Sequence, residues 1–233
     1  MSEATASDLP AKIVSATRRR GRIGERNRRE ILTAAERVFA RRGYRGARLD
    51  EIAEEVALPK ANLLYYFKSK EALYEAVIAD ILEVWLGALG EISVDDDPAE
   101  ALTGYIQRKM ALSKERPEAS RVFAMEVITG APVIGGYLQG YLRAWVERQG
   151  TVFRTWQRRG MMADLPPEHV FFTIWAVTQT YADFAPQVTA VLGVDRLDDG
   201  EFRDAVETVT AIVLRGLGIP IPAAGSTVAR RQI

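Results

Sequence analysis

The chain has 233 residues, of which 48% are hydrophobic and 27% are charged, and its formal net charge is zero. This length suits one large domain or two small ones, and the apolar fraction excludes a chain that is disordered throughout. The lack of cysteine excludes disulfides and thiolate metal sites. No apolar run reaches the ~18 residues of a membrane span, and the N-terminus lacks a signal-peptide pattern, so we expect a cytoplasmic protein.

The charge is distributed unevenly along the chain. Residues 1–48 contain 13 Lys or Arg and 5 Asp or Glu, a net +8, and residues 49–233 carry the compensating −8. This asymmetry predicts that the N-terminal part meets a polyanion such as nucleic acid, although a solubilising arginine tail is the alternative. Residues 1–24 are polar and basic without helical periodicity, so we expect a flexible arm there.

The first half of the remaining sequence shows apolar residues at helical spacing. A helix from about residue 25 should end at Gly43, as helices end at a C-terminal glycine. Two short helices are expected at 48–58 and 60–66, interrupted at Pro59, and a fourth at about 70–90 with Ser69 as its cap. The inward face of the first helix is predicted to consist of Ile31, Leu32, Ala35, Val38 and Phe39.

The second half of the sequence predicts further helices. Asp97, Pro98 and Glu100 form a helix start signal, and further helices are expected at about 117–129, at 133–160 with several glycines, and from Pro167 toward Pro186. Asp198 and Glu201 match a capping box that opens the last helix, and the tail 219–233 is expected to be disordered. No segment alternates as a strand would, so the fold class is all-α with about nine helices.

The first three helices suggest a helix-turn-helix DNA-binding domain over residues 25–70, followed by a larger helical domain over 71–218. The third helix would enter the major groove, with Leu63, Leu64 and Phe67 facing the small core. Lysine can donate to guanine and asparagine can pair with adenine, while a tyrosine hydroxyl can bind phosphate. The expected DNA contacts are Arg48, Lys60, Ala61, Asn62, Tyr65, Tyr66 and Lys70, the last as a phosphate contact. The alternative is that the aromatic residues are plain core.

The segment that begins at Arg48 resembles the DNA-binding domain of the TetR family of bacterial repressors. The matching residues are the pair Ile52-Ala53, the run Leu64-Tyr65-Tyr66-Phe67, and Lys70. The resemblance covers about residues 27–80. One departure is the turn, which usually reads Gly-Val-Ser in the family and reads Ala57-Leu58-Pro59 here. Losing the serine cap costs roughly 1 kcal/mol, which the fold should survive.

Three further segments, LLYYF, ASRVFAMEVITGAP and IWAVTQTYADFAPQV, resemble the pyrimidine-utilisation regulators of that family. The resemblance implies a homodimer that binds a palindromic operator and releases it on binding uracil or thymine. The residues permit such a ligand, because Trp175, Gln179 and Asp183 share one helical stripe. The expected contacts are Trp85 and Trp175 for stacking, Gln179 for a carbonyl and an N–H, Glu126 or Asp183 as acceptors, and Tyr181 as a donor. The alternative is that the tryptophans are core and that Asp183 serves as a cap or ion pair.

The sequence fits an enzyme, a repressor with another ligand and a DNA-bending protein less well. With no cysteine and a single histidine, His169, nucleophilic catalysis is not expected, and no phosphate-binding glycine motif is present, so the protein is predicted not to be an enzyme and to need no cofactor or metal. A TetR-type repressor for another small hydrophobic ligand would need a larger, more apolar pocket. A DNA-bending protein would not need the large second domain. Dimerisation is assigned to the last two helices, through Phe202, Val206, Val209 and Val213.

Overall fold

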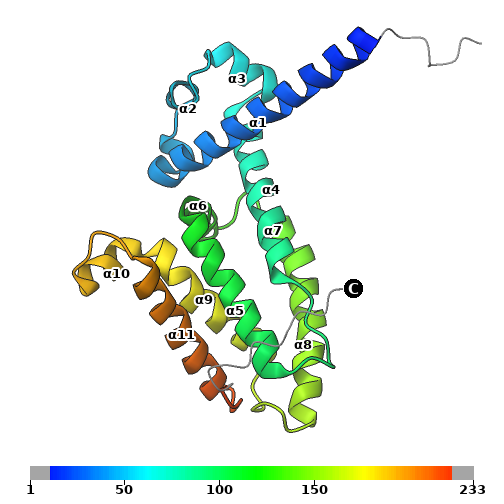
Figure 1. Ribbon diagram of the computed structural model, residues 1–233, viewed down its shortest axis with the longest axis vertical. Helices are drawn as coiled ribbons and strands as arrows, with labels where there is room; N and C mark the ends of the chain where they lie inside the picture. Colours follow the sequence, from blue (N-terminus) through cyan, green and yellow to red (C-terminus); the bar gives the residue numbers. More distant parts are fainter. Residues whose placement is uncertain (1–10, 222–233) are drawn as a thin grey trace, which may run out of the picture. The chain divides into compact units, whose positions relative to one another are not determined.

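A computed structural model describes residues 11–221 and places side chains at 24–85 and 90–221. Every regular element in this part of the chain is helical, which confirms the all-α class (Figure 1). None of its helices is long and apolar enough to cross a membrane. The helices form two compact units that divide between Ala79 and Asp80, inside α4 (Lys70–Leu89), rather than at residue 70.

The first helix is longer than its apolar periodicity indicates. α1 spans Ala11–Gly46, so residues 11–24 are helical and the expected flexible arm is wrong for them, while residues 1–10 lie outside the described residues. The segment has no proline after Pro10 and contains four arginines, which favour helix even without an apolar face. Helical geometry is interrupted at Gly43, which has a φ of 65°, close to where the sequence predicts the helix end.

The core of the first unit forms where α1 meets three following elements. α2 (Leu49–Glu55) packs on α1, and α3 (Lys60–Tyr66) packs on α2. Tyr74 of α4 meets Phe39 of α1 edge-to-face, with 4.9 Å between the ring centroids. The predicted apolar face of α1 is buried, and so are Leu63 and Phe67, whereas Leu64 is only half-buried. Periodicity therefore located this core correctly apart from Leu64.

Ion pairs fasten α1 to α2. Glu55 accepts hydrogen bonds from Arg37 and from Arg41, the latter at 2.7 Å, and Arg42 lies 3.3 Å from Glu51. Burial by itself would raise the pKa of Glu55, but the hydrogen bonds and charges of the two arginines lower it overall. Part of the basic charge in the N-terminal segment is thus neutralised within the unit.

The turn between α2 and α3 places an alanine in a conformation that favours glycine. Ala57 has a φ of 52°, and its N–H bonds to the Glu54 carbonyl while the N–H of Leu58 bonds to the Ala53 carbonyl at 3.0 Å. These two bonds define a Schellman motif, whose left-handed position is usually glycine. Pro59 then precedes α3 and provides no side-chain cap. The glycine and the serine of the usual Gly-Val-Ser turn are thus both replaced here, by Ala57 and Pro59.

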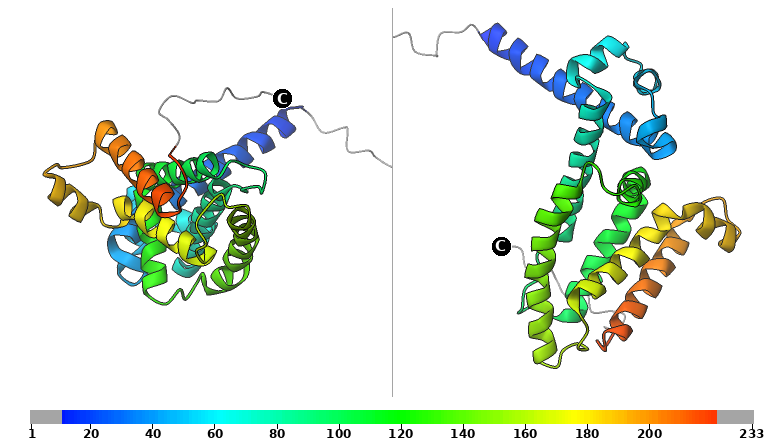
Figure 2. Two further views of the ribbon diagram at one scale, coloured as in Figure 1. Left: turned by 90° about the horizontal axis from the view of Figure 1, so that it is seen from below. Right: turned by 180° about the vertical axis from the view of Figure 1, so that it is seen from behind.

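The second unit is built around α9 (Pro167–Asp183), which contacts α5 (Pro98–Glu115), α6 (Pro117–Ile128), α8 (Arg143–Arg158) and α11 (Asp199–Gly216). In Figure 2, α9 in yellow and α11 in orange lie side by side in both views. Both predicted start signals are confirmed, because Asp97 accepts from the N–H of Glu100 and Asp198 forms a complete capping box with Glu201.

Large aromatic side chains fill the core of this unit. Tyr105, Phe153, Trp156 and Phe171 are fully buried, and Phe153 stacks on Phe171 at 4.7 Å. Trp175 donates from its indole nitrogen to the hydroxyl of Tyr105 at 2.7 Å. Burial raises the pKa of Tyr105 far above its ordinary value, so this hydroxyl remains a neutral hydrogen-bonding group.

Three helix boundaries differ from the sequence-based expectation. The helix expected over 133–160 is divided into α7 (Gly135–Tyr137), a π-helical turn η1 (Leu138–Leu142) and α8, because Gly135, Gly136 and Gly140 weaken the helix and face open space, whereas Gly150 inside α8 lies close to Pro167. Pro186 opens a separate helix, α10 (Ala185–Leu192), instead of ending α9. The tail expected to be disordered from residue 219 is still packed at its first residue, because Ile219 is buried in the core. Residues 222–233 lie outside the described range.

Candidate nucleic-acid interface and ligand cavity

One face of α3 is turned to solvent and carries most of the predicted DNA contacts. Lys60, Ala61 and Asn62 in its first turn are exposed, and the side chain of Tyr65 is 75% exposed. Leu63 on the opposite face is fully buried, so packing fixes which side chains point outward. An exposed phenol of this size next to a lysine and an asparagine offers donors and a flat apolar surface to a partner.

Neighbouring polar groups hold this face in place. Tyr66 is half-buried, packs edge-to-face on Tyr65 at 5.3 Å, and its hydroxyl accepts a hydrogen bond from Asn27 at 3.4 Å. Lys60 forms an exposed ion pair with Asp50 at 3.0 Å, which a phosphate or base could replace at small cost because exposed pairs are weak. Arg48, the exposed residue before α2, is also available at the surface.

Lys70 occupies a different position from the one expected. Its ammonium donates to the main-chain carbonyls of Tyr44 at 2.8 Å, Ala47 at 3.1 Å and Arg45 at 3.4 Å, and it lies over the Tyr44 ring. A lysine has three N–H donors, and these carbonyls occupy all of them. Lys70 thus ties the end of α1 to the start of α4, and the phosphate contact expected for it stays a prediction that these bonds do not favour.

The second unit contains a small cavity walled by aromatic rings. Its described lining residues come from α4, α5, α6, α7, η1 and α9, and they are Leu82, Trp85, Lys109, Phe123, Tyr137, Leu142, Trp175 and Gln179. The cavity measures about 50 Å³. At ~10–15 Å³ for each water this is room for about four waters, which is on the scale of a single six-membered ring. Trp85 and Phe123 lie 4.7 Å apart.

Lys109 is a charged lining residue that the sequence analysis did not identify. Its side chain is only 7% exposed, and its ammonium sits over the ring of Trp85, 4.7 Å from the centroid. Burial lowers the pKa of Lys109 to about 8, although the carboxylate of Asp183 acts in the opposite direction. A buried cation beside Gln179 gives an otherwise aromatic cavity two polar groups able to orient a ligand.

The structure brings three of the six predicted ligand contacts together. Trp85, Trp175 and Gln179 line the cavity, whereas the other three lie outside its described lining. Glu126 is buried and accepts from the N–H groups of Val133 at 2.6 Å and Ile134 at 3.3 Å, so it supports the loop before α7. Tyr181 packs against the core, and Asp183 accepts from the Ser120 hydroxyl at 2.5 Å while burial raises its pKa. The direct ligand role expected for these three stays a prediction that the described lining does not support.

Four other lining residues were missed because sequence gives no signal for them. Phe123, Leu82 and Leu142 read as ordinary apolar helix positions, and Tyr137 lies in a glycine-rich stretch. Tyr137 is half-buried, stacks on Tyr141 at 5.7 Å, and burial followed by the neighbouring Tyr141 raises its pKa to about 12. Its hydroxyl is therefore neutral at physiological pH.

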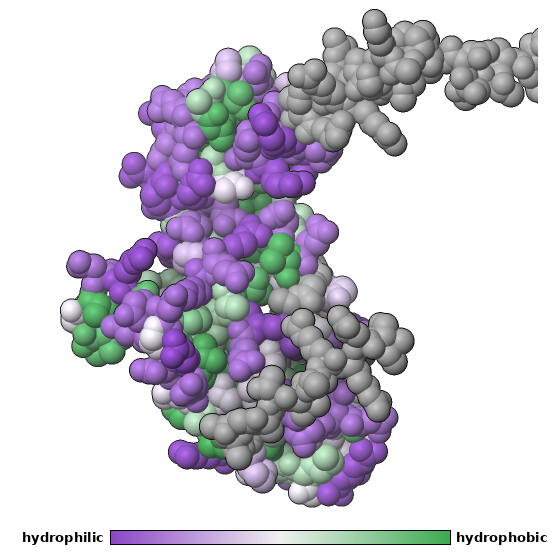
Figure 3. All heavy atoms as spheres, in the orientation of Figure 1, coloured by the Kyte–Doolittle hydropathy of each residue, from purple (hydrophilic) through white to green (hydrophobic). Residues whose placement is uncertain are grey.

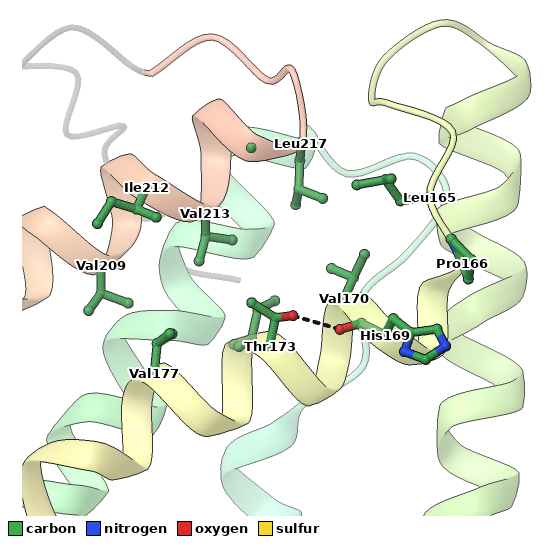
Figure 4. A pocket seen from close by; sticks show the side chains of 12 residues that line it. Leu165, Pro166, His169, Val170, Thr173, Val177, Val209, Ile212, Val213 and Leu217 are labelled. Carbon is green, nitrogen blue, oxygen red and sulfur yellow. Dashed lines mark hydrogen bonds between the residues drawn. The ribbon is translucent and has the colours of Figure 1, made fainter.

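An apolar groove runs between α9 and α11, as Figure 4 shows from close by. Val170, Val177, Val209 and Val213 form its walls, and its volume is about 320 Å³. Ile212 at its side is 64% exposed. Of the residues assigned to dimerisation, Val209 and Val213 line this groove, and Phe202 and Val206 pack against the core of the same unit, so their part in an interface stays a prediction.

Another apolar patch lies on α10. Val191 and Leu192 are exposed there, and Figure 3 shows green, hydrophobic atoms over this helix among purple, hydrophilic neighbours. Large exposed apolar side chains of this kind mark surfaces that other molecules cover.

Comparison with known proteins assigns both units to described families. The family model of bacterial regulatory proteins of the tetR family matches residues 31–77, and that of the YcdC-like protein C-terminal region matches residues 78–220. The chain is 42% identical over 204 residues to the HTH-type transcriptional regulator RutR of Escherichia coli K12, covering 88% of this chain and 96% of RutR.

Weaker matches also cover most of the chain. The HTH-type transcriptional repressor NicS of Pseudomonas putida is 26% identical over 85% of this chain and 95% of its own length. The solved structure of SCO4942 from Streptomyces coelicolor matches with a TM-score of 0.64 and 27% identity, covering 83% of this chain and 99% of that one.

Proposed function

The chain belongs to the TetR family of helix-turn-helix transcriptional regulators, and from this premise we propose that it binds a palindromic operator as a homodimer and is released by uracil or thymine. In this proposal it acts in the cytoplasm on genes of pyrimidine utilisation. The observation that carries the ligand proposal is the small aromatic cavity in which Trp85, Trp175 and Gln179 meet.

The DNA part of the proposal rests on the outward face of α3. In a helix-turn-helix the second helix of the motif lies in the major groove, and its first residues meet base edges. Lys60 and Asn62 occupy that first turn, and Tyr65 follows one turn later with its ring exposed. Two copies would place two such helices in successive grooves, about 34 Å apart.

Uracil matches the cavity in size, shape and polarity. It is flat and uncharged, so indole and phenyl rings can cover its faces. The carboxamide of Gln179 can donate to a ring carbonyl and accept from the neighbouring N–H. An acyl chain or a large hydrophobic drug needs more room than a cavity of about 50 Å³ provides, which disfavours the alternative ligand class.

The homodimer proposal rests on the groove between α9 and α11. Its lining is almost wholly aliphatic, and Ile212 projects beside it with most of its surface in water. A second copy of the same chain would cover this surface symmetrically, because a two-fold interface pairs one patch with itself. The last two long helices therefore remain the proposed interface, with Ile212 exposed beside the groove that Val209 and Val213 line.

Communication between the ligand and DNA sites is proposed to pass along α4. This helix contributes Trp85 to the cavity, and its first turn holds the end of α1 through Lys70. A pyrimidine stacked on Trp85 would favour a position of α4 that suits DNA poorly. The ligand must distinguish the two states by about 1–3 kcal/mol to act as an effector.

The test of the proposed function is thermal unfolding of the full chain with millimolar uracil, thymine, cytosine or uridine. A ligand that binds the native state raises the midpoint by mass action. We expect uracil and thymine to raise it, uridine to have no effect because its ribose cannot enter the cavity, and Gln179→Ala to abolish the shift. Absence of a shift with every pyrimidine would refute the effector assignment and leave the family membership intact.

A further inference from the structure

The polar groups that line the cavity differ in the kinds of hydrogen bond they can make. The amide of Gln179 can rotate to exchange its donor and acceptor, and the hydroxyl of Tyr137 can donate or accept. An ammonium can only donate. Among the described lining residues, the groups that can only donate are the ammonium of Lys109 and the indole N–H groups of Trp85 and Trp175, and that of Trp175 is already bonded to the Tyr105 hydroxyl at 2.7 Å.

This difference matters because uracil and cytosine have nearly the same shape. They share the C2 carbonyl and differ at C4, where uracil has a carbonyl oxygen and cytosine an amino group, and at N3, where uracil has an N–H donor and cytosine an acceptor. A rotating amide or hydroxyl can satisfy either molecule, so Gln179 and Tyr137 cannot separate them by themselves. Discrimination requires a group that can satisfy only one of the two.

The ammonium of Lys109 is placed to take that role. It is buried, it lines the cavity, and within the described residues its recorded partners are the Trp85 ring at 4.7 Å and the charge of Asp183. Asp183 is itself engaged by Ser120 at 2.5 Å and lies outside the described lining. A ring contact does not use the N–H donors as an acceptor atom would, so a ligand oxygen that reaches the ammonium would be favoured here.

We propose that Lys109 selects the ligand: it binds the C4 carbonyl oxygen of the pyrimidine on the side of α5 and excludes a pyrimidine that carries an amino group at C4. The inference rests on the proposed function, because it names the residue that gives the pyrimidine site its specificity. An amino group facing Lys109 would bring two donors together and leave the buried ammonium without an acceptor. Sites that require a specific hydrogen bond reject ligands lacking it far more strongly than apolar pockets reject a change of size.

The experiment is a titration of the full chain with uracil and with cytosine, followed by calorimetry and by the fluorescence of the cavity tryptophans. We expect the unmodified protein to prefer uracil by about a hundredfold or more. Lys109→Met keeps the unbranched shape and removes the donors, and Lys109→Gln supplies an amide that can rotate. In both variants we expect the preference to fall below about tenfold, mainly through weaker uracil binding. Lys109→Gln carries the test if the methionine variant does not fold.

Two controls separate selection from packing. Lys109→Arg retains a donor-only group, so the preference for uracil should persist even if affinity falls. Gln179→Ala should weaken both ligands and leave their ratio largely unchanged. Equal losses of uracil and cytosine in Lys109→Met and Lys109→Gln, with the ratio preserved, would overturn the inference while leaving the pyrimidine site in place. If the unmodified protein bound neither base, the proposed effector would fail, and the selection inference with it.

Discussion

Replacing Ala57 with glycine should stabilise the DNA-binding unit. Ala57 is the left-handed residue of the Schellman motif between α2 and α3, with a φ of 52°, and its side chain is exposed. A residue with a Cβ pays about 1–2 kcal/mol for this conformation relative to a right-handed one. Glycine avoids that strain but loses about 0.4–1 kcal/mol through the greater freedom of the unfolded chain. The net gain expected for Ala57→Gly is about 0.8 kcal/mol, the difference between these terms.

Native-state hydrogen exchange measures this change where it occurs. Amides that exchange through opening of the α2–α3 region, such as those of Ile52 and Leu63, should exchange about fourfold more slowly, since 1.4 kcal/mol corresponds to a factor of ten. The matched control is Ala61→Gly, an exposed position inside α3 where glycine should accelerate exchange by costing roughly 1 kcal/mol. Unchanged or faster exchange in Ala57→Gly would show that the turn carries no backbone strain and would refute this reasoning.

Four other outcomes are expected. Lys70→Met should lower the free energy of unfolding by about 2 kcal/mol in urea titrations, since it leaves three carbonyls without their charged donor; weaker DNA binding at unchanged stability would restore the phosphate role. Tyr65→Ala should reduce operator binding in fluorescence anisotropy more than binding to random DNA, and equal losses would contradict base reading. Ile212→Glu should give a monomer in sedimentation at micromolar concentration; an intact dimer would place the interface elsewhere. Burial lowers the pKa of Lys109 to about 8, while its ordinary value is 10.5, so between these pH values the unfolded chain binds more protons than the folded one. The unfolding free energy of the unmodified protein relative to Lys109→Met should therefore rise with pH over that range. A difference that does not change with pH would contradict the burial of this ammonium.

Local patterns in the sequence predicted the parts of the fold that depend on local chemistry. Apolar spacing identified the buried face of α1, and Asp97 and Asp198 marked two helix starts correctly, because a cap is formed by residues three positions apart. The outward position of Tyr65 followed from the same logic, since Leu63 and Phe67 had to face the core. These features could be predicted because their partners are near in sequence.

Features that depend on distant partners could not be predicted in this way. Lys70 binds carbonyls 23 to 26 residues earlier in the chain, and no pattern marks a main-chain acceptor. Lys109 lies between arginine and methionine in a helix that reads as amphipathic, and it is buried only because α5 packs against α6, α9 and α11 at once. Glu126 resembled a ligand contact for the same reason, since its partners, Val133 and Ile134, become visible only when the loop is folded.

The ion pairs between α1 and α2 have a consequence for how strongly salt should affect DNA binding. Cationic side chains strengthen binding to DNA by displacing condensed counterions, and each phosphate they neutralise steepens the dependence of affinity on salt. Arg37, Arg41 and Arg42 already have carboxylates of α2 as partners, so in the folded unit they release few ions when DNA arrives. The formal charge of the N-terminal segment therefore overstates its number of ionic contacts, and operator recognition should depend less on ionic strength than thirteen basic residues suggest.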